Sequence, residues 1–126
     1  MRKMVLFLFV IMGAALLFSC ASPPPPVDVA GPKSRAGEAL AKALTANANV
    51  AVKADYEKAQ ALFKEGQGLE ATDAAQAVAK YQECERAANG AYNAAVAKRE
   101  EASKQLEKAK SDIKALETEA GQSTGG

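Results

Sequence analysis

Alanine is the feature that most constrains this chain, because 27 of the 107 residues from Cys20 onward are Ala. The same segment contains no Trp, no His, one Ile and a single Phe. Alanine has the highest helix propensity but buries little apolar surface. We therefore expect an all-α fold, an elongated Ala-rich helical hairpin or coiled coil whose helices approach closely and form only a thin core.

The N-terminus has the layout of a secretory signal. Arg2 and Lys3 are followed by an uncharged apolar run of 15 residues from Met4 to Phe18. A membrane-spanning helix needs about 20 such residues, and no charged stop-transfer segment follows. The pattern predicts a signal peptide over residues 1–19, with an uncleaved signal anchor as the alternative.

The end of this run, Leu17-Phe18-Ser19-Cys20, resembles the lipobox of bacterial lipoproteins. Leu17 and Ser19 match that pattern, whereas Phe18 departs from the small or β-branched residue usual at its position. The resemblance implies cleavage between Ser19 and Cys20, a diacylglyceryl group on the Cys20 thiol and an acylated amino terminus, with palmitate as the expected chain. An ordinary signal peptide cut after Ala21 is the alternative.

The resemblance also bears on location. In this family Asp directly after the lipidated Cys favours the inner membrane, and here that residue is Ala21. We therefore expect a cell-envelope protein held by covalent lipid in the outer membrane, on either its periplasmic or its surface face.

A Pro-rich tether separates the anchor from the helices. All five Pro lie in residues 20–33, and the run Pro23–Pro26 favours a semi-rigid polyproline II spacer. We place the helical domain at residues 34–119, with Ser34 as its N-cap, and a disordered Gly-containing tail at residues 120–126.

The first helical segment, residues 34–65, has one apolar face formed by positions three or four apart. Its members are Leu40, Leu44, Ala48, Val52, Tyr56, Ala59 and Phe63. Residues 45–50 have poor helix propensity, so the helix frays or breaks there. Gly66 is expected to end the segment as a left-handed cap.

A second helix is expected from about residue 73 to 119, capped by Thr72 or Asp73. Two sets of residues in it recur every seven positions, offset like the core positions of a coiled coil. One set is Ala74, Tyr81, Ala88, Ala95, Ala102, Ala109 and Leu116, and the other is Val78, Glu85, Tyr92, Arg99, Leu106 and Ile113. Because the phase is the same on both sides of Asn89-Gly90, we favour a continuous helix over a turn there. Cys84 faces inward in place of Glu85.

The two expected helices differ in length, and this difference defines a candidate interface. A helix over residues 34–65 covers only the near part of a helix that reaches residue 119. The apolar residues Leu106, Ile113 and Leu116 would then lack a cover, and an uncovered apolar stripe is normally an interaction surface. We expect either self-association or a protein partner.

One part of the chain resembles a tetratricopeptide repeat. Ala77, Tyr81 and Cys84 stand at the small, aromatic and small positions of the second helix of such a repeat. The resemblance covers about 30 residues once, with Gly66 one residue out of phase, and repeat arrays normally contain at least three units. It implies helix-hairpin kinship and, as an alternative function, a peptide- or protein-binding module.

The residues do not assemble a catalytic site. The absence of His removes the commonest general base and metal ligand. The neighbouring carboxylates Glu83/Glu85 and Glu100/Glu101 do not face each other on a helix. We expect no enzyme activity, cofactor, metal or small-molecule substrate.

The charge from Cys20 onward, 14 basic against 15 acidic residues, also predicts no nucleic-acid binding. The expected function is a lipid-anchored structural or adaptor module.

Overall fold

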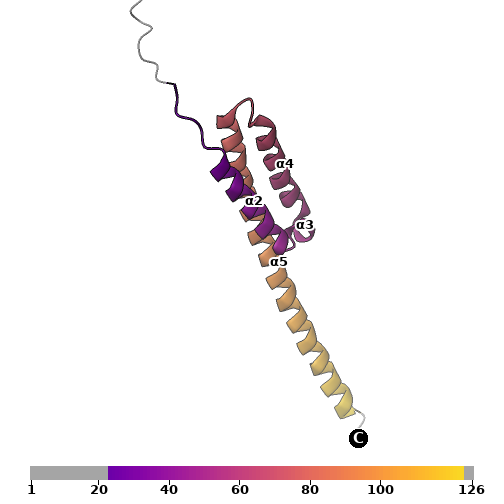
Figure 1. Ribbon diagram of the computed structural model, residues 1–126. Helices are drawn as coiled ribbons and strands as arrows, with labels where there is room; N and C mark the ends of the chain where they lie inside the picture. Colours follow the sequence, from indigo (N-terminus) through magenta and orange to yellow (C-terminus); the bar gives the residue numbers. More distant parts are fainter. Residues whose placement is uncertain (1–22, 124–126) are drawn as a thin grey trace, which may run out of the picture.

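The structure is a computed structural model, and it describes residues 23–123. This part of the chain is all-α, with no strand among its elements. The helices are α2 (Ala30–Thr45), α3 (Ala48–Ala51), α4 (Lys53–Leu69) and α5 (Ala74–Ser123). α2 and α4 run side by side in opposite directions against the first half of α5, and the second half of α5 projects alone (Figure 1).

The break expected at residues 45–50 is present, but it reverses the chain direction, so residues 34–65 belong to two antiparallel helices rather than to one interrupted helix. Asn47 adopts the left-handed conformation, with φ of 58°, and Val52 leaves the helical region, with φ of −139° and ψ of 53°. Asparagine tolerates the left-handed region better than other non-Gly residues. The weak stretch at residues 45–50 therefore forms a turn containing α3, and the hairpin becomes a three-helix bundle.

The first helix also begins earlier than expected. α2 starts at Ala30, and the Asp28 carboxylate accepts a hydrogen bond from the Gly31 amide at 3.3 Å, so Ser34 is not the N-cap. Pro32 lies buried in the first turn, where proline costs little because its missing N–H would have no partner within the helix. The Pro-rich tether therefore ends before Ala30, and residues 23–26 are exposed and without secondary structure.

Gly66 is not a left-handed cap either. No described glycine has a positive φ, and α4 continues through Gly66 to Leu69. Gly66 is buried because the ring of Tyr81 from α5 lies against it. The glycine is needed for the close approach of two helices rather than for a turn.

α5 confirms the expected continuous helix. It runs through Asn89 and Gly90 without interruption, over 50 residues, which corresponds to about 75 Å. Asp73 caps its start, because its carboxylate accepts a hydrogen bond from the Gln76 amide at 2.9 Å. Residues 120–123, the described part of the expected disordered tail, are helical and belong to α5, because a single Gly121 is too weak a helix breaker to stop the helix at residue 119.

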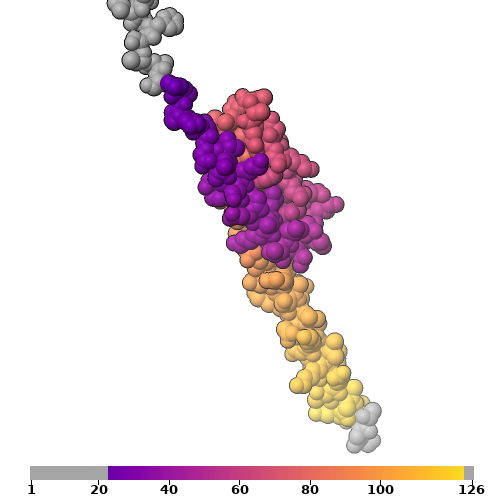
Figure 2. All heavy atoms as spheres, in the orientation of Figure 1, coloured from indigo at the N-terminus to yellow at the C-terminus, as the bar shows by residue number. Residues whose placement is uncertain are grey.

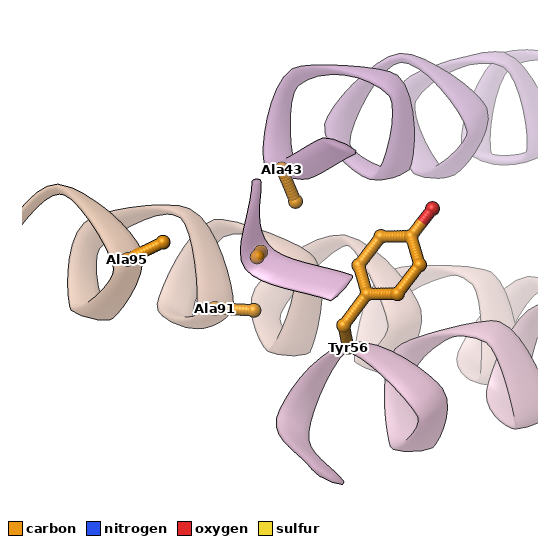
Figure 3. Packing of buried hydrophobic residues seen from close by; sticks show 5 residues of the cluster. Ala43, Tyr56, Ala91 and Ala95 are labelled. Carbon is orange, nitrogen blue, oxygen red and sulfur yellow. The ribbon is translucent and has the colours of Figure 1, made fainter. Parts of the chain in front are cut away.

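The core is thin and rich in alanine, as the composition indicates. Most of its fully buried members are Ala, and the largest fully buried side chains are Tyr81 and Cys84. Figure 3 shows one end of it, where the ring of Tyr56 from α4 lies beside Ala43 of α2 and Ala91 of α5. Near the other end, the rings of Phe63 and Tyr81 pack edge to face, with centroids 5.3 Å apart.

Candidate interaction surface

The bundle ends at Lys98. Its ammonium group donates a hydrogen bond of 2.8 Å to the backbone carbonyl of Ala51, at the end of α3. This bond satisfies a carbonyl that has no partner within the short helix. Every residue from 97 to 123 is exposed, and beyond Lys98 the projecting half of α5, residues 98–123, packs against no other described helix (Figure 2).

Within the bundle, the second set of buried positions on α5 lies one residue earlier in the sequence than expected. The buried positions alternate at spacings of four and three, and they are Ala77, Tyr81, Cys84, Ala88, Ala91 and Ala95. The first heptad set is therefore confirmed at Tyr81, Ala88 and Ala95. The second set is wrong here, and the inward orientation expected of Cys84 is confirmed.

Close packing explains the correction in the second set. α2 approaches α5 through Ala36, Ala39 and Ala43, which leaves room for small side chains between the helices. The larger side chains lie at the edge instead. The guanidinium of Arg35 pairs with Glu85 at 3.4 Å, and the ammonium of Lys42 lies 4.4 Å from the centre of the Tyr92 ring.

Beyond Ala95 the apolar residues of α5 move to a different face of the helix. Continuing the buried positions Ala77, Cys84 and Ala91 by sevens gives Lys98, Gln105 and Asp112, all of which are polar. The first set continues as Ala102, Ala109 and Leu116, and its apolar companions are now Leu106 and Ile113. This change inserts an extra spacing of four, which is a stutter in the heptad pattern.

We define the apolar stripe as the five residues Ala102, Leu106, Ala109, Ile113 and Leu116. All five are exposed, and the fractional exposures of Leu106, Ile113 and Leu116 are 56%, 57% and 65%. The structure thus places the three expected interface residues together on the projecting half of α5. At 100° per residue they lie within about 80° of Lys98, on the side of α5 that carries α3.

The projecting half also carries Glu100 and Glu101, neither of which pairs with the other. Within the bundle, the carboxylate of Glu83 contacts Lys80 at 3.8 Å, and Glu85 pairs with Arg35. These carboxylates form surface ion pairs with cations rather than an acid–base pair. The described residues contain no group of His, Cys, Asp and Glu that could hold a metal ion.

Cys84 is fully buried between α2, α4 and α5. Burial, with a smaller contribution from the charge of Glu85, raises the pKa of its thiol to about 11. The thiol is therefore protonated near neutral pH and behaves as a small apolar group. Tyr81, one turn earlier, donates a hydrogen bond to the carboxylate of Glu70, and its pKa is raised mainly by burial.

Sequence reasoning missed the contacts that join separate elements. Glu70 accepts from Tyr81 and also pairs with Lys33 at 2.9 Å, which ties the start of α2 to the α4–α5 turn. The carboxylate of Glu65 in α4 pairs with Lys80 of α5 at 2.8 Å. Because the partners are far apart in the sequence, no local sequence pattern predicts these pairs. The one available signal for the end of the bundle is a Lys at position 98, where the buried spacing would require an apolar residue.

The groove between α4 and α5 bears on the tetratricopeptide resemblance. Ala77, Tyr81 and Cys84, the residues that carry the resemblance, are buried. They face α2 as well as α4, because Ala36 of α2 packs in the same cluster. α2 therefore occupies the face of the α4–α5 hairpin on which another helix or a peptide would dock.

The expected signal peptide and the lipid-attachment residue lie outside the described residues, as do Ser19 and the cleavage site before Cys20. Among the described helices, none combines the length and the apolar composition needed to cross a bilayer. Comparisons with protein-family models, curated proteins and solved structures give no match for this chain.

Proposed function

We propose that this chain is a lipid-anchored protein of the bacterial cell envelope that acts as a structural or adaptor module through helix–helix contacts. The observation that carries the proposal is the apolar stripe, which lies exposed on the projecting half of α5. Three large apolar residues spaced for one helix face form a surface that another helix can cover.

The arrangement of the two ends of the molecule supports this role. The linker before α2 leaves the bundle at the end opposite to the projecting half of α5 (Figure 1). A tether attached there would not obstruct the stripe. Residues 23–28 are exposed and, as a polyproline-like segment, would extend about 19 Å from the bundle.

The proposed anchor rests on the sequence Leu17-Phe18-Ser19-Cys20 and on the apolar run before it. Each buried methylene contributes about 0.8 kcal/mol, and two or more acyl chains give stable attachment without a membrane-spanning helix. Ala21, in place of Asp, favours the outer membrane as the site of attachment.

A tetratricopeptide-like peptide-binding module is less well supported. The hairpin face that such a module would use is filled by α2 through Ala36, Ala39 and Ala43. An enzymatic role is not proposed, because the sequence supplies no His and no evident nucleophile–base pair.

The anchor and the interaction are tested separately in the source bacterium. Cys20→Ser should abolish incorporation of a labelled fatty acid and release the protein from membranes, whereas Cys84→Ser serves as the control for loss of a thiol. Crosslinking in intact cells, followed by mass spectrometry, should recover either a second copy or one envelope protein bound through residues 98–123. Unchanged labelling and membrane partitioning of the Cys20 variant would exclude the anchor.

A further inference from the structure

The charges of the projecting half are divided unequally along its length. Residues 98–110 carry five basic and three acidic side chains, whereas residues 111–123 carry one basic and three acidic side chains. The half nearer the bundle is therefore basic by two charges and the far half acidic by two. A parallel pair of such helices would place like charges together, and an antiparallel pair would place opposite charges together.

From this complementarity we propose that the occupant of the apolar stripe is a second copy of the same chain, bound antiparallel along residues 98–123. The inference rests on the proposed helix–helix function and specifies its partner. The stripe lies on the side of α5 that carries α3, so the second copy would continue the layer of α2 and α4 beyond the end of the bundle.

The end of the bundle sets the register of this pair. Lys98 contacts Ala51 of α3, so a helix on this face cannot extend past Lys98 without meeting α3. For the described residues, the fullest overlap without a clash places Arg99 of one copy opposite Ser123 of the other. A shift of one heptad further would drive the tip into α3, and a shift of one heptad less would uncover Ala102.

That register also matches the apolar residues. It places Leu106 opposite Leu116 of the second copy, Ala109 opposite Ile113, and Ala102 opposite Ala120. A large residue thus faces a small one in the layer nearest the two-fold axis, an arrangement that lets two helices interdigitate. The overlap of 25 residues, from Arg99 to Ser123 in each copy, is about 38 Å long.

The antiparallel pair places the two linkers at its two far ends, because each linker leaves its bundle opposite to the projecting half (Figure 1). Residues 23–28 would span about 19 Å in a polyproline conformation. Two anchors in one membrane are therefore compatible with a rod that lies along the membrane surface rather than standing on it.

Disulfide trapping in the full-length chain, expressed in its own membrane, tests the register. Two differently tagged copies are co-expressed, one with Ala102→Cys and the other with Ala120→Cys. Cysteine is close to Ala in size, so neither change removes a large apolar residue. We expect a disulfide between positions 102 and 120 of different copies, identified by peptide mapping that separates it from any bond of Cys20 or Cys84.

Two controls accompany this pair. Each variant expressed alone should form no disulfide at its new Cys. In the antiparallel register, position 102 of one copy lies level with position 120 of the other, so two copies of the same new Cys are about 27 Å apart along the helix axis. Lys104→Cys co-expressed with Thr118→Cys lies at matched levels of the same register but on the outer face of the helix. This pair should also remain unlinked.

The other outcomes separate the partner from the function. Disulfides formed by each variant alone would indicate a parallel pair and overturn the antiparallel inference, while helix–helix association would stand. Trapping of a different envelope protein would overturn the second copy and leave the adaptor role intact. Two results together would overturn both the second copy and the helix–helix function. They are the absence of any trapped species and unchanged recovery of crosslinked partners by a Leu106→Ser/Ile113→Ser variant.

Discussion

The ring of Tyr81 lies directly against the backbone of Gly66, so that a Cβ atom placed on Gly66 would be 2.8 Å from Cε1 of Tyr81 and 3.0 Å from its Cζ. Real Cβ atoms do not approach ring carbons this closely. The Tyr81 ring is also held by its edge-to-face contact with Phe63 and by its hydrogen bond to Glu70. The ring therefore has little freedom to move away.

Gly66→Ala is expected to destabilise the bundle despite the higher helix propensity of alanine. Overpacking a tight contact costs about 1–3 kcal/mol, which exceeds the gain of about 0.5–1 kcal/mol from replacing a helical glycine. Urea unfolding followed by circular dichroism measures the change. An equal or higher free energy of unfolding would show that the Tyr81 ring can shift at low cost.

Gly90→Ala is the matched control and a prediction of its own. Gly90 lies in the interior of α5, is exposed, and has no atom within 4 Å of a Cβ built on it. With no contact to lose, the variant should gain about 0.5–1 kcal/mol in the free energy of unfolding. If residues 89–90 instead formed a turn in solution, the alanine variant would be destabilised.

The contrast between these glycines shows which parts of the fold can be read from the sequence. Gly66 looks like a helix cap because nothing nearby in sequence indicates that Tyr81, fifteen residues later, needs the space. Asn89-Gly90 resembles a turn signal, but the heptad phase on both sides correctly favours a continuous helix. Periodicity over many residues is informative, whereas a single residue that owes its identity to a distant contact is not.

The reversal at Asn47 illustrates the same limit. The low propensity of residues 45–50 predicts a break but not its geometry, because one residue in the left-handed region redirects the whole chain.

The buried positions of the second heptad set also differ from those expected, again because of a contact between distant parts of the sequence. Val78 and Tyr92 are more apolar than Ala77 and Ala91, yet the close approach of α2 favours the smaller pair. The exposure of Leu106, Ile113 and Leu116 was predictable because it follows from helix lengths alone.

Asp73→Ala should weaken the start of α5. The Asp73 carboxylate accepts hydrogen bonds from the Gln76 backbone amide at 2.9 Å and from its side-chain amide at 2.6 Å. We expect the midpoint of thermal unfolding to fall by about 5 °C, whereas Asp73→Asn should retain most of the cap. Equal losses in the two variants would indicate that the charge, rather than the cap, carries the effect.

The same carboxylate predicts a pH dependence. Its hydrogen bonds with Gln76, the backbone bond first, hold the pKa of Asp73 below its usual value of 3.8. A lowered pKa contributes stability that is present above pH 4 and is lost as the pH falls through the folded-state pKa. Thermal unfolding between pH 5 and pH 2 should therefore converge for the wild-type chain and Asp73→Asn.

Alkaline pH should destabilise the bundle through Cys84. Burial raises the pKa of the thiol from 9.0 to about 11, so its contribution to stability is complete below pH 9 and is lost as the pH rises to 11. At about 1.4 kcal/mol per pKa unit, the loss is on the order of 2–3 kcal/mol. Cys84→Ala should show a shallower decline over this range, and Tyr81 and Lys80, whose pKa values are also raised, contribute to the loss that both proteins share. Parallel declines in urea titrations at pH 8 and pH 11 would exclude a role for the thiol.

Leu106→Ser/Ile113→Ser should separate folding from association. Both residues lie beyond the last contact between α5 and the bundle, so the free energy of unfolding of the bundle should not change. Most far-ultraviolet helicity should persist, while association of the full-length chain in detergent, measured by analytical ultracentrifugation, should be lost. The matched control is Glu107→Ser/Lys114→Ser, which changes the adjacent positions, keeps the seven-residue spacing and leaves the net charge unchanged. If this control also dissociates the protein, general weakening of the helix explains the effect. If instead the Leu106/Ile113 variant unfolds the bundle, then the stripe belongs to an internal core and is not an interaction surface.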